Sequence, residues 1–444
     1  MTKLRMHALV WGVVMLLGSC SKDSVEASRS PEVEIPAEAI SKLDTKQDLD
    51  VLLNDIGDAR YVLLGEASHG TSEYYTWRAA ITRRLVQEKG FKLVAVEGDW
   101  PDAYQLNSYI RGTGTSGSAR ETLVQSFERW PTWMWANEEV AELAEWLKRH
   151  NQAQATDRQV GFYGLDVYSL WESMEEVQRY MRQTNPGGAQ AAAAALQCFA
   201  SYNRDEWDYA QAATTIASAS CADELENLLK VAQQQAEASP AGDEAAFNAL
   251  QNALVALNAE RYYRTAIKSD VESWNVRDRH MLQTINNLAQ HHGPDAKIVV
   301  WEHNTHVGDA RYTDMANAGM VNVGQLVREQ HAAQGVYLVG FGSYAGRVIA
   351  AERWGAPLRE IRVPQAQPGT WEHILHQIPP ANKIMLLRPL RQDPNLLQRR
   401  GHRAIGVSYS PGAEAGNYVP TILPERYDAF LFIDETSALR PLKQ

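Results

Sequence analysis

Four short apolar segments, each leading into an acidic residue or a histidine, constrain the fold of this chain more than any other feature. They are residues 60–64, 92–96, 160–164 and 297–301. The apolar residues are nearly continuous rather than alternating, as in parallel strands that are covered on both faces. Helical stretches separate the segments, which indicates β-α-β units with right-handed crossovers. We therefore predict an α/β fold with a mostly parallel central sheet flanked by helices.

Five later segments also have the composition of strands. They are residues 336–341, 347–351, 384–387, 404–407 and 429–433. Because they follow the four strands that carry polar ends, we expect them to form additional or antiparallel edges of the same sheet.

Residues 167–290 differ in composition from the rest of the chain. Ala, Glu, Gln and Leu dominate, and Gly and Pro gather in two turns, at 185–188 and 239–242. This pattern predicts a long helical insertion. The insertion would divide the α/β core into a first part, residues 46–166, and a second part, residues 291–444.

The N-terminus predicts an exported protein. Lys3 and Arg5 precede an apolar run at residues 8–17, which is too short to span a membrane and is typical of a secretory signal. The run ends in Leu17-Gly18-Ser19-Cys20, which resembles a bacterial lipobox with Cys20 as the lipidated residue. A plain signal peptide with a chance cysteine is the alternative.

We thus expect a signal peptide at residues 1–19 and a polar tether at 20–45. A lipid on Cys20 would be the only attachment to the membrane. Ser21 follows the cysteine, which favours the periplasmic face of the outer membrane in a host with two membranes.

Two cysteines, Cys198 and Cys221, remain after Cys20. In an exported protein two such thiols are candidates for a disulfide. Both lie in the predicted helical insertion, where a disulfide would join two neighbouring helices.

Several functions are disfavoured by the sequence. The chain has 54 Asp and Glu against 43 Lys and Arg, and it has no basic run, so nucleic acid is not an expected partner. It also has no G-x-S-x-G elbow, which disfavours a serine hydrolase. Phosphate-binding glycine motifs are absent as well, so no nucleotide cofactor is expected.

Acidic and imidazole side chains follow the predicted strands where parallel strands bring their carboxyl ends together. These residues are Glu66, His69, Glu97, His303 and His306. Histidine titrates near neutral pH, and a neighbouring carboxylate orients it as a general base. The alternative is a metal site in which His303 and His306 bind a divalent ion and Glu66 or His69 completes the set.

Arg78 is a further candidate. Tyr74, Arg78, Ile81 and Leu85 are spaced by four, three and four residues, so they share one face of the helix predicted over 71–88. A buried guanidinium needs a carboxylate, which Glu66 or Glu97 would supply. Alternatively, Arg78 extends to solvent at the edge of the apolar stripe.

These residues lie in motifs that resemble those of the erythromycin esterase family. The motifs run in family order through nearly all of the chain after residue 45: 64–70, 96–100, 164–168, 275–281, 301–306 and 403–407. The resemblance implies an α/β core with added helices around a deep cleft, with the helical insertion forming one side of that cleft. It also implies ester hydrolysis by an activated water molecule, without a nucleophilic serine and without a metal or other cofactor.

Carried over by position, the resemblance makes His69 the general base and places Glu66, Arg78, Glu97, His303 and His306 in the active site. The expected substrate is a macrolide lactone or another large ester. The expected mechanism has Glu66 or Glu97 orienting His69, while Arg78, His303 and His306 contact the carbonyl. The alternatives are an esterase or transferase acting on envelope polysaccharide, and a periplasmic binding protein without catalytic activity.

Overall fold

The computed structural model describes residues 33–443, and every structural statement below concerns these residues. The predicted signal peptide, the lipidation site at Cys20 and the tether up to residue 32 lie outside them. None of the helices in the described part of the chain combines the length and apolar character needed to cross a membrane.

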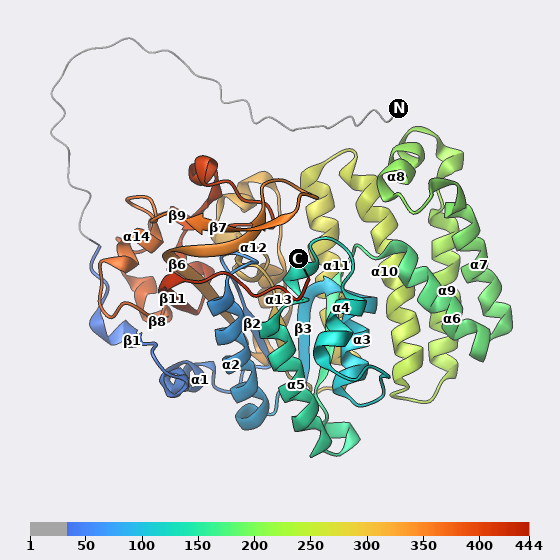
Figure 1. Ribbon diagram of the computed structural model, residues 1–444, viewed down its shortest axis with the longest axis horizontal. Helices are drawn as coiled ribbons and strands as arrows, with labels where there is room; N and C mark the ends of the chain where they lie inside the picture. The colour runs from blue at the N-terminus through green and yellow to red at the C-terminus, as the bar shows by residue number, and fades with distance from the viewer. Residues whose placement is uncertain (1–32, 444) are drawn as a thin grey trace, which may run out of the picture. The chain divides into compact units, whose positions relative to one another are not determined.

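A nine-stranded sheet forms the centre of the described chain (Figure 1). Its strands are β1 (Ile40–Lys42), β2 (Tyr61–Leu64), β3 (Leu93–Asp99), β4 (Gly161–Asp166), β5 (Ile298–Trp301), β6 (Val336–Ala351), β7 (Leu358–Val363), β8 (Lys383–Leu386) and β11 (Ala429–Thr436). Their order is β1-β8-β11-β6-β2-β5-β3-β4, with β7 paired to β6. The strands from β11 to β4 are parallel, which confirms the predicted α/β fold.

Burial explains why β2 to β5 are apolar up to the acidic residues at the ends of β3 and β4. Every residue of these four strands is buried, because helices cover both faces of the sheet. In the α/β part these helices are α1 (Asp50–Ile56), α2 (Ser72–Lys89), α3 (Trp100–Ile110), α4 (Ala119–Ser126), α5 (Glu138–Gln152), α12 (Asn304–Val307), α13 (Val323–His331), α14 (Trp371–His376) and α15 (Leu423–Arg426). Short 3-10 turns link several of them.

The positions of the late strands differ from the prediction. β6 is one strand that covers both 336–341 and 347–351, and it lies in the middle of the sheet beside β2. β11 is parallel to it on the other side. Only β1, β7 and β8 are antiparallel edge elements. The prediction failed for β6 and β11 because the order of strands along the chain does not determine their order in the sheet.

The strand predicted at 404–407 is also wrong. The strand in this region is β9 (Arg400–Arg403), which pairs with β10 (Tyr418–Thr421) in a separate two-stranded sheet. Ile405 makes only an isolated bridge to Ser68. Ile405 is apolar because it is buried against residues of β6 and β7, and not because it belongs to a strand of the sheet.

The folded unit begins before the predicted end of the tether at residue 45. β1 pairs with β8, and Leu43 is completely buried in the main hydrophobic core. Three residues of strand in a polar stretch gave too weak a pattern to be recognised.

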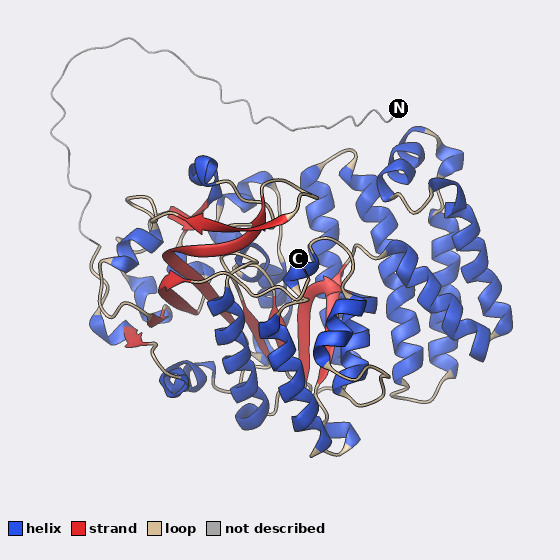
Figure 2. Ribbon diagram, in the orientation of Figure 1, coloured by secondary structure: helices blue, strands red, loops and turns tan. Residues whose placement is uncertain are grey.

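Six helices occupy the region of the predicted insertion, and Figure 2 shows this strand-free region beside the sheet. They are α6 (Leu170–Thr184), α7 (Pro186–Phe199), α8 (Glu206–Thr215), α9 (Ala222–Ala238), α10 (Glu244–Ala266) and α11 (Asp270–His291). α6 to α10 enclose an apolar core of their own. α11 contacts both α10 and β4 and so joins the insertion to the sheet.

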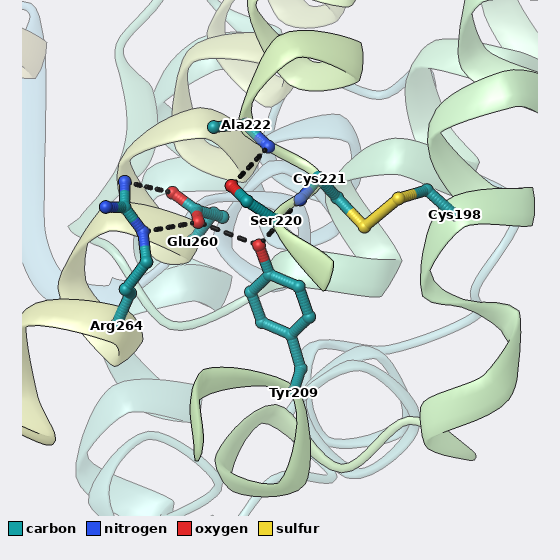
Figure 3. The surroundings of a disulfide bond; sticks show 7 residues. All are labelled: Cys198, Tyr209, Ser220, Cys221, Ala222, Glu260 and Arg264. Atoms are coloured by element: carbon teal, nitrogen blue, oxygen red, sulfur yellow. Dashed lines mark hydrogen bonds and ion pairs between the residues drawn. A yellow bond between two sulfur atoms is a disulfide. The ribbon is translucent and has the colours of Figure 1, made fainter. Parts of the chain in front are cut away.

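A disulfide between Cys198 and Cys221 joins the last turn of α7 to the residue that precedes α9 (Figure 3). The backbone N–H of Cys221 donates to the hydroxyl of Tyr209, which donates to Glu260 on α10. Arg264 completes this network by donating to Glu260. The disulfide therefore lies in a hydrogen-bonded junction of four helices, α7 to α10.

Candidate active site

The polar residues predicted at the strand ends converge on one cavity. Parallel strands β2, β3, β4 and β5 end at the same edge of the sheet, which is the usual place for a ligand in such folds. A cavity of about 330 Å³ opens there. His69, Glu97, His303 and His306 all line it, as does Asp166 at the end of β4.

The ends of β2 and β5 are held close together. The backbone N–H of Asn304 donates to the carbonyl oxygen of Glu66 at 2.8 Å. A Cβ atom on Gly65 would lie 2.1 Å from the Asn304 Oδ1 atom, so only glycine permits this approach. The two segments that carry His69 and His303 are thereby placed side by side.

Glu66 connects His69 to Arg78. The Nδ1 atom of His69 lies 3.0 Å from Glu66 Oε1, and Arg78 donates to Glu66 Oε2 at 2.6 Å. Arg78 is 0% exposed, and its guanidinium also lies over the rings of Tyr75 and Trp301. The bidentate use of Glu66 fixes the ring of His69 and leaves its Nε2 atom facing the cavity.

Arg78 therefore has a different position from the one expected for a carbonyl ligand. It is buried behind Glu66 and does not line the cavity. The expected direct contact with substrate is corrected: Arg78 is a positioning residue that neutralises Glu66. The alternative in which Arg78 extends to solvent is also wrong.

His69 has a raised pKa. Burial alone lowers it, but the negative charges of Glu97 and Glu66 outweigh burial, so the pKa of His69 lies above its usual value of 6.5. The same two carboxylates therefore stabilise the imidazolium that forms when His69 accepts a proton.

His303 is held as a neutral hydrogen-bond donor. The hydroxyl and the backbone N–H of Thr305 both lie within hydrogen-bond distance of its Nδ1 atom, at 2.8 and 3.3 Å. An N–H can only donate, so Nδ1 is the acceptor and the proton is on Nε2. Burial and the neighbouring His69 lower the pKa of His303 well below 6.5.

The Nε2–H of His303 is buried and has no partner within residues 33–443. The rings of His69 and His303 lie 4.9 Å apart, centroid to centroid. A base and an unused donor therefore face the same small space.

His306 is committed to protein contacts through both ring nitrogens. Arg277 donates to its Nε2 atom at 3.0 Å, and its Nδ1 atom donates to Asp278 at 2.9 Å. Its ring stacks on Trp274 at 4.4 Å. His306 therefore supports Arg277, and its ring nitrogens do not face a substrate atom.

Arg277, on α11, joins two carboxylates at the strand ends. It donates to Glu97 at 2.8 Å and to both oxygens of Asp166 at 2.8 and 2.6 Å. Burial raises the pKa of both acids, but neighbouring positive charge, which Arg277 supplies to each of them, outweighs burial, so the pKa of each lies below its usual value. Both carboxylates are thus ionised.

Three residues of this network were absent from the predicted set: Asp166, Arg277 and Asp278. Asp166 ends a strand in the same way as Glu97, which was a usable signal. Arg277 and Asp278 lie in the motif at 275–281, but nothing in a helical sequence indicates which side chains reach a sheet 100 residues away.

The donor set does not fit the metal site considered as an alternative. Both nitrogens of His306 are occupied, and one of them faces the guanidinium of Arg277, which would repel a cation. The Nδ1 atom of His303 accepts from Thr305. Only one nitrogen of the pair is left, whereas a stable site needs at least three protein ligands.

The remaining walls of the cavity are mainly aromatic. Phe127, Trp135, Tyr168, Trp274 and Trp354 line it. The cavity thus offers apolar surface around a polar floor, as small-molecule sites do.

Comparison with known proteins identifies the sequence family. The erythromycin esterase family model matches residues 86–436. The chain is 29% identical over 143 residues to the erythromycin esterase type II of Escherichia coli, a match that covers 31% of this chain and 32% of that protein. It is 22% identical over 322 residues to the putative hydrolase YbfO of Bacillus subtilis strain 168, covering 68% and 69% of the two chains.

Solved structures share the fold. A protein from Bacillus cereus has a TM-score of 0.76 at 18% identity, covering 92% of this chain and 97% of that one. A succinoglycan biosynthesis protein has a TM-score of 0.72 at 21% identity, covering 95% and 100%. A mutant of the erythromycin esterase EreC in its open conformation has a TM-score of 0.62 at 16% identity, covering 89% and 95%.

Proposed function

Because the chain belongs to the erythromycin esterase family, we propose that it hydrolyses the lactone of a macrolide, or a similar large ester, with a water molecule activated by His69. Membership of the family supports a hydrolase of small-molecule esters. The macrolide and the water-based mechanism are the proposed part. The carrying observation is the chain Arg78–Glu66–His69, which leaves the His69 Nε2 atom without a protein partner in a cavity that His303, whose Nε2–H is also unpaired within residues 33–443, lines as well.

In the first step the Nε2 atom of His69 removes a proton from water, and the water oxygen forms a bond to the ester carbonyl carbon. Glu66 accepts a hydrogen bond from Nδ1 and stabilises the imidazolium that forms. The carbonyl oxygen becomes an oxyanion and receives a hydrogen bond from the Nε2–H of His303.

In the second step the bond between the carbonyl carbon and the alkoxy oxygen breaks. His69 returns its proton to the departing oxygen, so that the products are an alcohol and a carboxylic acid, which releases its proton to solvent and becomes a carboxylate. For a lactone both groups stay on one molecule, which gains the mass of one water. Because His303 is neutral before and after, it acts only as a hydrogen-bond donor.

The direct test is incubation of the purified protein with erythromycin, followed by mass spectrometry. We expect a product heavier by one water and a His69→Ala variant that is slower by about 10²-fold or more. The matched control is His150→Ala, which removes a histidine that stacks on Trp146 far from the cavity and should leave the rate unchanged. Erythromycin that binds without a change of mass would support the binding-protein alternative, and near-normal turnover by His69→Ala would refute the role of His69.

We also propose that the protein is an exported lipoprotein, based on the sequence from Lys3 to Ser21. A periplasmic esterase would meet a macrolide before the drug reached the ribosome. The same location also suits an ester of the cell envelope. The erythromycin experiment separates these two substrates.

A further inference from the structure

Carboxylates outnumber cations in the walls of the catalytic cavity. The acidic lining residues are Glu97, Asp99, Asp102 and Asp166, and the arginines are Arg129 and Arg277. Arg277 is shared by Glu97 and Asp166. Arg129 binds both oxygens of Asp99, at 2.6 and 2.9 Å. Each arginine is therefore fully used, and one carboxylate has no cation.

That carboxylate belongs to Asp102, in the first turn of α3. Within the described residues its side chain makes no hydrogen bond and no ion pair with protein groups, although it is partly buried. Burial and the charge of Asp99 raise the pKa of Asp102 to about 8. The charge of Arg129, which is bound to Asp99, lowers this pKa but does not outweigh burial and the neighbouring acids, so the carboxyl group keeps its proton.

The acidic residues of α6 near Asp102 are paired with arginines, whereas Asp102 is not. Asp102 also borders an adjacent cavity of about 370 Å³, which Glu172, Glu175 and Glu176 line. Arg204 pairs with Glu172 and Glu175, and Arg179 pairs with Glu176. The acids of the adjacent cavity are thus neutralised, while Asp102 lies between the two cavities without a partner.

Aromatic rings complete the surroundings. Tyr168 already carries guanidinium groups near its ring, with the Cζ atoms of Arg129 and Arg277 at 4.7 and 5.0 Å from its centroid. Trp274 and Trp354 line the same cavity, and Trp354 is 66% exposed on the turn between β6 and β7. A cavity that holds both aromatic rings and an unpaired carboxyl group favours an organic cation.

We propose that this cavity selects ester substrates that carry a positively charged amino group, and that Asp102 pairs with that group. The inference rests on the proposed hydrolysis, because it names the substrate class of the same site. An ammonium group beside Asp102 favours loss of the proton from its carboxyl group, so the ion pair forms when the substrate binds. Hydrolysis turns the ester into a carboxylate, which gains no such pair from Asp102.

An ammonium group fits this site better than a divalent metal ion. A metal needs several oxygen ligands, and the neighbouring carboxylates of Asp99 and Asp166 are already bound by arginines. One free carboxylate with aromatic neighbours is sufficient for an ammonium group. The His303 Nε2–H lies in the same cavity and is left for the ester carbonyl.

The test uses two esters of nearly the same shape, benzoylcholine and 3,3-dimethylbutyl benzoate, which differ by a quaternary nitrogen in place of a carbon. Binding is measured by the fluorescence of the cavity tryptophans, and hydrolysis by chromatography of benzoate. We expect the wild-type protein to prefer benzoylcholine about 5- to 10-fold in Kd and in kcat/KM, as for one partly screened charge pair. Asp102→Asn should reduce this ratio to about one.

Two further variants make the ratio interpretable. Asp102→Glu keeps the charge and should keep most of the preference, which covers the case in which Asp102→Asn does not fold. Asp157→Asn removes an exposed carboxylate before β4, at the opposite edge of the sheet, and should leave the ratio unchanged. A charge effect of the whole protein would instead lower the ratio in both asparagine variants.

The outcomes separate the two proposals. Equal binding of the two esters by the wild-type protein, or an undiminished preference in folded Asp102→Asn, overturns the role of Asp102 even if both esters are hydrolysed. Binding that favours benzoylcholine through Asp102, without release of benzoate, supports the cation site and counts against hydrolysis of such esters. A preference in both measurements that Asp102→Asn removes supports both.

Discussion

The surroundings of His69 and His303 shift the pKa of these two imidazoles in opposite directions. Both are buried, which by itself lowers the pKa of an imidazole. His69 lies beside Glu66 and Glu97, which raise its pKa above the usual value. His303 accepts hydrogen bonds from Thr305 and faces His69, so its pKa is lowered. One imidazole is therefore suited to take a proton and the other to donate a hydrogen bond.

Glu66→Gln should shift the pH dependence of the reaction. His69 must be unprotonated to act as a base, so kcat/KM rises as pH increases through its pKa. Glu66 raises that pKa, and its removal should move the acidic limb of the profile to lower pH. The rate on the plateau should fall by about 10-fold or more, because the ring loses its orienting partner.

Glu88→Gln is the matched control for this variant. Glu88 pairs with Arg84 on the exposed side of α2. An acidic limb that stays in place in Glu66→Gln, or moves in Glu88→Gln, would contradict the assigned role of Glu66.

His303→Ala should lower kcat by about 10²- to 10³-fold, as expected for the loss of one oxyanion donor. His303→Gln places an amide N–H near the position of the imidazole Nε2–H and should recover part of this loss. Because the donor acts on the transition state, KM should change much less than kcat. Steady-state kinetics of the two variants with the same ester provide the measurement, and equal rates for both would argue against a hydrogen-bonding role.

At the scale of elements, the helical insertion is attached to the sheet by α11. Arg277 on this helix binds Glu97 on β3 and Asp166 on β4. On the same helix, Asp278 accepts a hydrogen bond from His306, which follows β5. The insertion thus contributes directly to the catalytic network, while its distal helices α7 and α9 provide none of the residues that line the cavity.

Removal of the disulfide in the distal part should therefore affect stability but not catalysis. The bond closes a loop between residues 23 apart, for which loop entropy implies a stabilisation of about 3 kcal/mol. The double variant Cys198→Ser, Cys221→Ser should lose about this much in chemical denaturation. Its kcat with a small ester should stay within about twofold of wild type, and a large fall in kcat with unchanged stability would show that the distal helices couple to the cavity.

At the scale of the whole molecule, the proposed attachment to the membrane depends on Cys20 alone. The described part of the chain has no membrane-spanning helix. The full sequence is acidic, with 54 Asp and Glu against 43 Lys and Arg. Such a chain is not attracted to anionic lipids.

Cys20→Ala should therefore move the protein from the membrane fraction to the soluble fraction of cells. It should also abolish incorporation of labelled palmitate, while the purified variant keeps its esterase activity. Membrane association that persists in Cys20→Ala would mean that another segment binds the membrane. An unlabelled wild-type protein would mean that the N-terminus is a plain signal peptide.

The sequence by itself determined the sheet strands that carry the site and the residue types at their ends. Continuous apolar runs at 60–64, 92–96, 160–164 and 297–301 require burial on both faces, and this local requirement is visible without any tertiary contact. The same runs brought Glu66, His69, Glu97, His303 and His306 to one edge. Their catalytic roles remain predictions.

Only the tertiary structure decided which of these groups touch each other. The sequence left both Glu66 and Glu97 as partners of Arg78, and the fold placed Glu66 between Arg78 and His69. It placed Glu302, next to His303, where both its oxygens lack a partner in the described chain and burial raises its pKa far above the usual value.

The position of β6 beside β2 and the reach of Arg277 from α11 to β3 and β4 were equally invisible in the sequence. The physical reason is that apolar pattern encodes how much a residue must be buried, whereas hydrogen bonds and ion pairs depend on distances between segments far apart in the chain. Those distances are set by packing of the whole core, and no local stretch of sequence specifies them.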